Sequence, residues 1–232
     1  KKSIVKSMTR NDSYIKEKII NQMENIFLHD DIENAASYFK DDFICELKTA
    51  ADKTLSNKFY ILHEYRNNIY DEETGHYKWY HDYATGFRYK ITHYSEVRQK
   101  NIHEGVDIKH LWELSRMQYL FAPALYWRIS GDSKYAEFVI KVLSDWIDEN
   151  RYEEGPNWNI AMEVGIRVTN MILVFQLIKN YEGLENSFCE KFVASAYLHL
   201  KFILNNEEKY MGKAYNHYLG NLIGVLAVSA AF

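Results

Sequence analysis

The chain has 232 residues, with 28 Lys and Arg against 32 Asp and Glu, so its formal net charge is −4 at pH 7. This balance argues against a general nucleic-acid binder, because neutralising a phosphate backbone favours a basic domain. It does not exclude an acidic sugar, since one uronate needs only a local positive pocket. The side chains that could form one are Lys109, Arg116, Arg167 and His217.

The composition is that of a folded, mainly helical protein: 47% of the residues are hydrophobic and only 2 are proline, which breaks helices. The 19 tyrosines suit either a sugar-binding surface or a tyrosine-rich core. Cys45 and Cys189 are too few for a disulfide framework and lack zinc-ligand spacing, so we expect two buried free thiols. We predict no metal site and no cofactor.

Charged residues interrupt every hydrophobic run, which predicts no membrane span. The start is basic but is not followed by the apolar region of a signal peptide, and it has no initiator Met. The last residues, LIGVLAVSAAF, end inside a predicted helix, so we expect a chain trimmed at one or both ends. The compartment stays open: periplasmic or secreted for a degradative enzyme, cytoplasmic for a biosynthetic one.

Apolar residues recur at helical spacing from Ser13 to Leu28, which predicts a helix with a Lys- and Glu-rich outer face. One or two shorter helices are expected over 31–55. From Ser56 to Glu104 the chain is dense in Tyr, His and Trp and has no sustained periodicity. This pattern indicates an extended, aromatic-rich segment, with short strands, that packs against the helices.

From Asp107 onward the helical pattern is regular, and the connections are short. Helices are predicted over 107–129, 133–149, 157–179, 185–204 and 216–232. Their predicted N-caps are Asp107, Asp132, and Asn157 or Asn159. Short links favour antiparallel hairpins, so we predict an all-α fold, an incomplete (α/α) toroid or a solenoid. Residues 1–106 would hold the N-terminal helices and the extended segment, and 107–232 the first part of the toroid.

Two of these helices carry polar residues beside aromatic ones. In 107–129, Trp112 and Arg116 lie on one face, where the guanidinium could grip a sugar carboxylate while the indole stacks on the ring. The alternative is an interhelical Arg–Glu pair beside a core Trp. In the 157–179 helix, Glu163 precedes Arg167 by four residues, the favourable spacing for an intrahelical ion pair.

Asn157 and Trp158 place an amide and an indole at the start of that helix. Asn216 and His217 open the last helix, and Gly220 and Gly224 follow on one face, where they would let a neighbouring helix pack closely. Taken by themselves, an Asn at this place is a helix cap and a lone His is a packing or surface residue.

Four segments together resemble the helical domain of the heparinase II/III and alginate lyase group: DIKHLWELSRMQ at 107–118, GDSKYAEFV at 131–139, PNWNIAMEVGIRV at 156–168 and YNHYLGNLIG at 215–224. The extended stretch, with Trp79 and Thr85-Gly86, resembles the part that precedes the toroid in that family. The resemblance implies a helical toroid and the cleavage of uronic-acid polysaccharides by β-elimination. It implies that Asn216 and His217 neutralise the uronate carboxylate, with His217 near the proton taken from C5. Such neutralisation stabilises an enolate-like transition state.

The same resemblance makes four residues candidates for lining or bracing the cleft: Asn157, Trp158, Glu163 and Arg167. It also implies a Tyr general acid/base on a later helix and a C-terminal β-sheet domain, both expected beyond Phe232. Tyr215 and Tyr218 do not match that tyrosine. We therefore predict that this chain alone is inactive and that the intact protein acts on an acidic polysaccharide or oligosaccharide, with the polymer left open.

Two other functions fit the residues. One is a non-catalytic scaffold or glycan-binding domain of the same fold, which could serve in polysaccharide biosynthesis. In such a domain we expect Asn216 and His217 to be buried and bonded only to the protein. An inverting glycoside hydrolase needs two carboxylates facing each other across a cleft, about 6.5 to 9.5 Å apart. Glu113 and Glu163 are the available pair.

Overall fold

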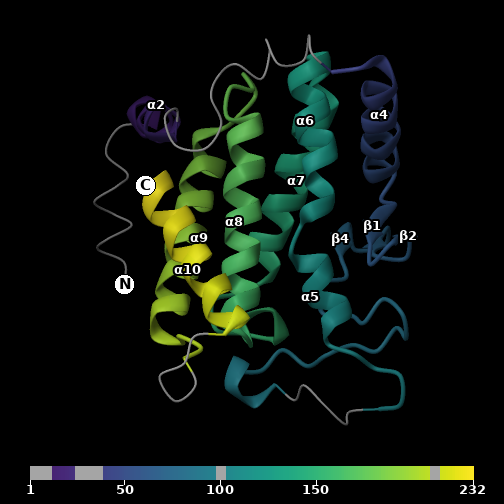
Figure 1. The fold of residues 1–232 in the computed structure, drawn as a ribbon, viewed down its shortest axis with the longest axis vertical. Coiled ribbons are helices and arrows are strands. Elements are labelled where there is room, and N and C mark those ends of the chain that lie inside the picture. Colours follow the sequence, from purple (N-terminus) through teal and green to yellow (C-terminus); the bar gives the residue numbers. More distant parts are fainter. Residues whose placement is uncertain (1–11, 24–38, 98–102, 210–214) are drawn as a thin grey trace.

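A computed structural model describes residues 12–23, 39–97, 103–209 and 215–232. The α-helices are α2 (Asp12–Met23), α4 (Asp41–Leu55), α5 (Lys109–Ser115), α6 (Phe121–Ser130), α7 (Ser133–Glu149), α8 (Ala161–Ile178), α9 (Asn186–Asn205) and α10 (Asn216–Ala231). Short 3-10 helices are η1 (Tyr94–Glu96), η2 (Gln118–Leu120) and η3 (Pro156–Trp158). From α6 to α10 the long helices stand side by side in an array, the all-α, toroid-type arrangement that was predicted (Figure 1).

Helix α8 is the central helix of the array and packs against α6, α9 and α10. By length and composition alone it could cross a membrane, which the sequence analysis did not expect. However, 72% of it is buried inside the fold, as in the core helix of a globular domain. Its apolar surface is therefore used by the neighbouring helices.

Glycines bring α8 and α10 into backbone contact. A Cβ atom added at Gly165 would lie 2.3 Å from the carbonyl oxygen of Gly220, and one added at Gly224 would lie 2.6 Å from the Cα of Gly165. The predicted close packing at Gly220 and Gly224 is confirmed. Because the backbones of the two helices are in contact at these glycines, the position of α10 along the axis of α8 is fixed.

We expect Gly165→Ala to destabilise the fold by about 1–3 kcal/mol, because the added methyl group meets backbone that must move. In an exposed helix, alanine is more stabilising than glycine by about 1 kcal/mol. A net loss of stability in Gly165→Ala would therefore be due to the clash of the added methyl group with α10. Urea unfolding measures the change, and Ser229→Ala, on the exposed side of α10, is the control. A Gly165→Ala protein as stable as the wild type would contradict the contact.

The predicted helix 107–129 is wrong as a single helix. It is divided into α5, η2 and α6, with Met117 in the left-handed region at φ 59°. Pro123 explains the break, since it lacks an amide hydrogen and its ring clashes with the carbonyl of Tyr119 in a continuous helix. In the first turn of α6 this proline is tolerated. The break turns Arg116, at the end of α5, toward α8.

The predicted caps have mixed outcomes. Asp132 caps α7 by accepting the amide hydrogen of Lys134 at 3.3 Å. Asp107 accepts from Lys109 at 2.9 Å, next to the first turn of α5. The predicted cap at Asn157 or Asn159 is wrong, because α8 begins only after Ile160, which has no capping side chain.

Other boundaries are close to those predicted. Of the helix expected over 13–28 the structure describes α2 up to Met23, and of the region 31–55 it describes α4; the remainder lies outside the described residues. Cys189 is buried, but Cys45 is exposed on α4, so the expectation of two buried thiols is wrong for Cys45. The outer face of α4 is polar, and a small thiol is tolerated there.

Between α4 and α5 the chain forms the aromatic-rich segment that was predicted. Strands β1 (Phe59–Ile61) and β2 (Glu64–Arg66) pair antiparallel, as do β3 (Tyr70–Asp71) and β4 (His76–Tyr77). The segment then runs along one end of the helix array, where Trp79 is only 1% exposed.

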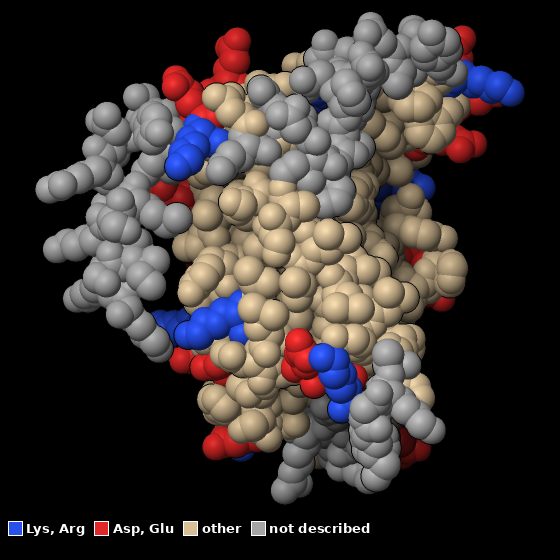
Figure 2. Space-filling model, turned by 60° about the vertical axis from the view of Figure 1, so that its left-hand side comes forward, with Lys and Arg blue, Asp and Glu red and all other residues tan. Residues whose placement is uncertain are grey.

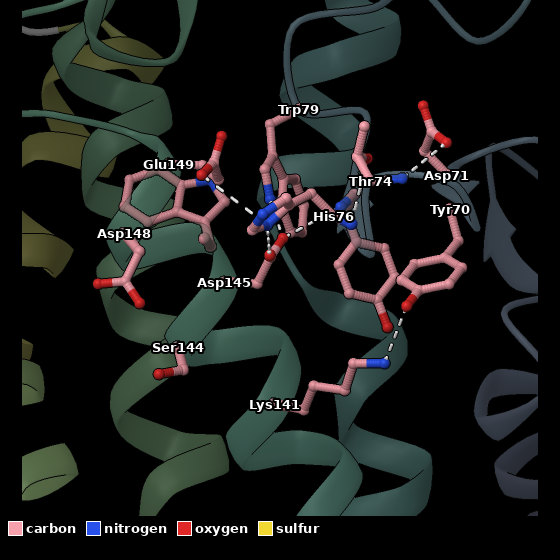
Figure 3. A network of polar contacts seen from close by, with 12 residues as sticks. Tyr70, Asp71, Thr74, His76, Trp79, Lys141, Ser144, Asp145, Asp148 and Glu149 are labelled. Atoms are coloured by element: carbon pink, nitrogen blue, oxygen red, sulfur yellow. Dashed lines mark hydrogen bonds and ion pairs between the residues drawn. The ribbon is translucent and has the colours of Figure 1, made fainter.

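Asp145 of α7 fastens this segment to the helices (Figure 3). Its carboxylate accepts from Nδ1 of His76 at 2.6 Å, from the amide of Tyr77 at 3.1 Å and from Nε1 of Trp79 at 2.8 Å. The hydrogen bond and the charge of Asp145 raise the pKa of His76. One carboxylate therefore orders three residues within four positions of a segment that has little regular structure.

The raised pKa of His76 predicts a pH-dependent stability. Folding favours the protonated ring, so its contribution is fully present below the unfolded pKa of about 6.5 and is lost as the pH rises through the raised folded value. We expect His76→Gln to remove this loss when thermal unfolding is followed from pH 6 to 9. Trp79→Phe should instead lower stability similarly at every pH, because the indole does not titrate. An unchanged pH dependence in His76→Gln would exclude this role.

Candidate functional site

The predicted site residues gather at one end of the helix array. They lie on α5, on η3, on the first two turns of α8 and at the start of α10. Figure 1 shows α5 and the beginning of α10 at the lower end of the array. The structure therefore brings together residues that are about 100 positions apart in the sequence, from Trp112 to His217.

Arg116 and Glu163 form the central ion pair at this end. The guanidinium binds the carboxylate through two hydrogen bonds, Nε to Oε2 at 2.8 Å and Nη2 to Oε1 at 2.7 Å. Glu163 is 2% exposed, and Asn170 adds a hydrogen bond to the carbonyl of Arg116 at 2.8 Å. The interhelical Arg–Glu pair, one of the two interpretations of the sequence, is confirmed.

The expected pairing of Glu163 with Arg167 within α8 is wrong, because Arg116 reaches Glu163 first after the break at Met117. Glu113 binds the same guanidinium, and burial raises the pKa of the Glu113 carboxyl group. Glu113 and Glu163 therefore converge on one cation. They do not face each other across a cleft, as an inverting glycoside hydrolase would require.

The surface formed by α5, η3 and the first turns of α8 is called the wall below. It is braced from inside the protein by Trp112, Asn157 and Trp158. The indole of Trp112 donates to the carbonyl of Pro156 at 2.9 Å. The amide of Asn157 donates to the carbonyl of Trp79 at 3.1 Å and to Oδ1 of Asn150 at 2.8 Å. All three of these side chains are buried, so Trp112 is a core Trp, the alternative to stacking on a sugar ring. Of the two roles expected for Asn157 and Trp158, lining and bracing, their contacts correspond to bracing.

Arg167 is buried below them, at 1% exposure. Its guanidinium lies 4.3 Å from the ring centre of Trp146 and 5.3 Å from that of Trp158, within the range of cation–π attraction. Nε donates to Nε2 of His199 at 3.0 Å. Burial lowers the pKa of Arg167 to about 9, so the group is a cation at neutral pH.

The partner of Arg167 has a defined tautomer. Nδ1 of His199 lies 2.7 Å from the carbonyl oxygen of Ser195, which can only accept, so this nitrogen carries the hydrogen. Nε2 is then free to accept from Arg167. Burial, together with the charge of Arg167, holds the pKa of His199 well below its usual range.

Sequence reasoning missed His199 and Trp146 as parts of this site. Their position on apolar helical stripes was the available signal, since His199 falls in register with the buried residues Phe192, Ala196 and Phe202. A histidine at such a position needs a buried partner, and α8 supplies one.

We expect Arg167→Ala to lower the free energy of unfolding by at least about 2 kcal/mol, through the cavity and the lost cation–π contacts. Urea titration measures this loss. Lys134→Ala is the control, because Lys134 also lies over a ring, that of Tyr135 at 4.8 Å, but its side chain is 54% exposed. Similar small losses in both variants would contradict a structural role for Arg167.

Asn216 and His217 lie at the open side of the same end. Asn216 is exposed, and the His217 side chain is 42% exposed. Nδ1 of His217 lies 2.9 Å from Oε1 of Glu208. The other oxygen of Glu208 accepts from the amide of Met162 at 2.7 Å, in the first turn of α8. A carboxylate thus joins His217 to the start of α8, and its charge suits the positive end of that helix.

Asn221 completes this arrangement. Its Oδ1 accepts from the backbone amide of Glu208 at 2.8 Å, and its Nδ2 lies 3.4 Å from Oε2 of the same residue. Neither Glu208 nor Asn221 was predicted from the sequence, because Glu208 belongs to no helix and its spacing to His217 follows no motif. Among the described residues, no group of three His, Cys, Asp or Glu side chains could hold a metal ion.

Comparison with known proteins identifies the family. Residues 8–232 match the family model described as Heparinase II/III N-terminus. The match spans nearly the whole chain, so the chain belongs to this family. The predicted resemblance is confirmed at this level.

Among curated proteins, the chain is 30% identical over 131 residues to a heparin-sulfate lyase of Bacteroides thetaiotaomicron. The aligned part covers 52% of this chain and 17% of that protein. Two crystal structures of the heparan sulfate lyase HepC from Pedobacter heparinus share the fold. A mutant form has a TM-score of 0.57, 21% identity, and coverage of 95% of this chain and 30% of HepC. The other structure has a TM-score of 0.51 and 18% identity, and the match covers 89% of this chain and 29% of HepC. The chain spans less than a third of these relatives.

Proposed function

We propose that the chain is the N-terminal part of a polysaccharide lyase that cleaves a uronic-acid-containing polysaccharide by β-elimination. The family and the names of the relatives, a heparin-sulfate lyase and a heparan sulfate lyase, support this class of substrate. The observation that carries the proposal is the exposure of Asn216 and His217 next to a rigid, buried wall. The non-catalytic scaffold predicts the reverse, a pair that is buried and bonded only to the protein.

β-Elimination requires that the negative charge of the uronate carboxylate be neutralised. A base removes the proton at C5, its electron pair forms the C4–C5 double bond, and the C4–O bond breaks as the leaving oxygen is protonated. The amide of Asn216 would donate a hydrogen bond to the uronate carboxylate and stabilise the charge that develops on it, and the ring of His217 would lie beside the proton removed from C5. The Tyr expected on a later helix would supply the proton transfer.

Electrostatics concentrate this task on the exposed pair. Arg116 is neutralised by Glu163, and Arg167 is buried beneath two indoles, so neither guanidinium is available to a sugar in this structure. Of the four side chains considered from the sequence, His217 and the exposed Lys109, which lies 3.8 Å from the carboxylate of Asp107, are left to contact a sugar. Close-range contacts, of Asn216 with the carboxylate and of His217 with the C5 proton, would take the place of an open cluster of charges.

The outer face of α10 supports a longer toroid as part of the proposal. Leu219, Leu222, Ile223 and Leu226 are between 42% and 63% exposed and follow helical spacing. This side of the molecule shows a broad surface with few charged side chains (Figure 2). Such a stripe fits a further helix of the same protein, which would carry the second wall of the cleft and precede the proposed β-sheet domain.

The test uses the intact parent protein and the ultraviolet absorbance of an unsaturated uronate product. We expect His217→Ala and Asn216→Ala each to reduce product formation by about 10²-fold or more, the usual contribution of a positioned catalytic group. The melting temperature should change little, because Asn216 is exposed and the His217 side chain is half-exposed. Asn186→Ala replaces the first residue of α9, at the other end of the array, and should leave activity unchanged.

Two results would count against the proposal. If both substitutions unfold the protein and leave the activity per folded molecule intact, Asn216 and His217 are structural. If the intact protein binds acidic oligosaccharides without forming product, the glycan-binding alternative holds. The 232-residue chain by itself should be inactive, since the proposed catalytic Tyr and second wall of the cleft would be supplied by other parts of the intact protein.

A further inference from the structure

The carboxylate of Glu208 is held in place by two hydrogen-bond donors that contact one of its oxygens. Its Oε2 receives the amide hydrogen of Met162 at 2.7 Å and lies 3.4 Å from Nδ2 of Asn221. The backbone amide of Glu208 is itself held by Asn221 at 2.8 Å. Helices α8 and α10 thus fix this carboxylate from two directions, and Oε1 is left for His217.

This geometry sets the tautomer of His217. An ionised carboxylate has no hydrogen to donate, so in the neutral imidazole the hydrogen must reside on Nδ1, which faces Oε1 at 2.9 Å. The lone pair is then on Nε2, at the opposite edge of a half-exposed ring. The same arrangement, in which a fixed carboxylate orients an imidazole, governs proton transfer in many enzymes.

We propose that Glu208 is a positioning residue of the elimination: it holds His217 in the Nδ1–H tautomer and presents Nε2 to the substrate. This inference rests on the proposed lyase function and adds a residue outside the Asn216-His217 motif. Glu208 acts through His217 and does not touch the sugar.

Replacing the carboxylate by an amide should invert the tautomer. In Glu208→Gln only one oxygen remains, and two donors, the Met162 amide and Asn221 Nδ2, already require it. The new NH₂ group would then face His217. Nδ1 must accept from it, so the ring hydrogen moves to Nε2 and the lone pair is lost from the edge that meets the substrate.

The first experiment measures the tautomer directly in the 232-residue chain. Long-range ¹H–¹⁵N correlation spectra of histidine-labelled protein should show Nδ1–H for neutral His217 in the wild type and Nε2–H in Glu208→Gln. Glu207→Gln is the matched control, because Glu207 is the neighbouring residue and pairs with Lys209, at 2.7 Å. Its spectrum should equal that of the wild type.

The second experiment measures kinetics in the intact parent. Glu208→Gln should lower kcat by about 10²-fold or more, with little change in KM, because the wrong tautomer impairs the chemical step. Glu207→Gln should leave kcat unchanged. Retained kcat in a Glu208→Gln protein whose tautomer has inverted would overturn the positioning role.

Failure of this inference differs from failure of the proposed function. A wild-type chain with Nε2–H on neutral His217 overturns the inference even if the parent is an active lyase, and this measurement needs no variant to fold. A parent without lyase activity overturns the proposed function, whereas the tautomer measurement still reports whether Glu208 orients His217.

Discussion

The site depends on the direct backbone contact between α8 and α10. A Cβ atom added at Gly165, Gly220 or Gly224 would lie within 2.7 Å of a neighbouring atom, so the two helices meet at a distance that a larger residue at these positions does not permit. As a result the first turn of α8 and the first turn of α10 lie at the same level. Only then can one carboxylate, that of Glu208, bind both Met162 and His217.

Two polar pairs, Arg116 with Glu163 and Arg167 with His199, lie at or near the same end of the array. Glu163, Arg167 and His199 are buried and Arg116 is half-buried, so the pairs are largely removed from water at a cost that good hydrogen-bond geometry must offset. Such groups are a poor source of stability, since apolar residues of equal volume pack without that cost. They define direction, however, because a two-point guanidinium–carboxylate pair tolerates one orientation. Helix α5 is thereby fixed to α8 at the end where the site lies.

The sequence predicted most of the helices, because long amphipathic periodicity survives tertiary packing. It failed where packing or a single residue decides. Pro123 divides the helix over 107–129, and the resulting turn gives Arg116 to Glu163 instead of leaving Glu163 to Arg167. Local spacing predicts an i to i+4 pair, and it contains no information about a third residue 47 positions away.

The candidate site was predictable only in part for the same reason. The motif at Asn216 and His217 is contiguous and could be seen, and the exposure of both agrees with a functional role. Glu208 could not be seen, since its importance arises from three contacts with α8 and α10 that exist only in the fold. A glutamate outside any helix is in most cases a solvated residue, and nothing in its neighbours distinguishes it from Glu207.

The distribution of charge gives the last argument about substrate recognition. Of the cations expected near the cleft, Arg116 and Arg167 bind groups of the protein itself, so the chain would meet the proposed uronate with an amide, an imidazole and few open charges. Such a surface does not attract polyanions over long distances, because attraction beyond about 10 Å is screened by salt and needs clustered charge. It suits close-range recognition, in which the carboxylate is desolvated and hydrogen-bonded where the negative charge of the elimination develops. Capture of a long acidic polymer would then fall to the second wall of the proposed cleft, and the described wall would contribute the rigid groups that the reaction requires.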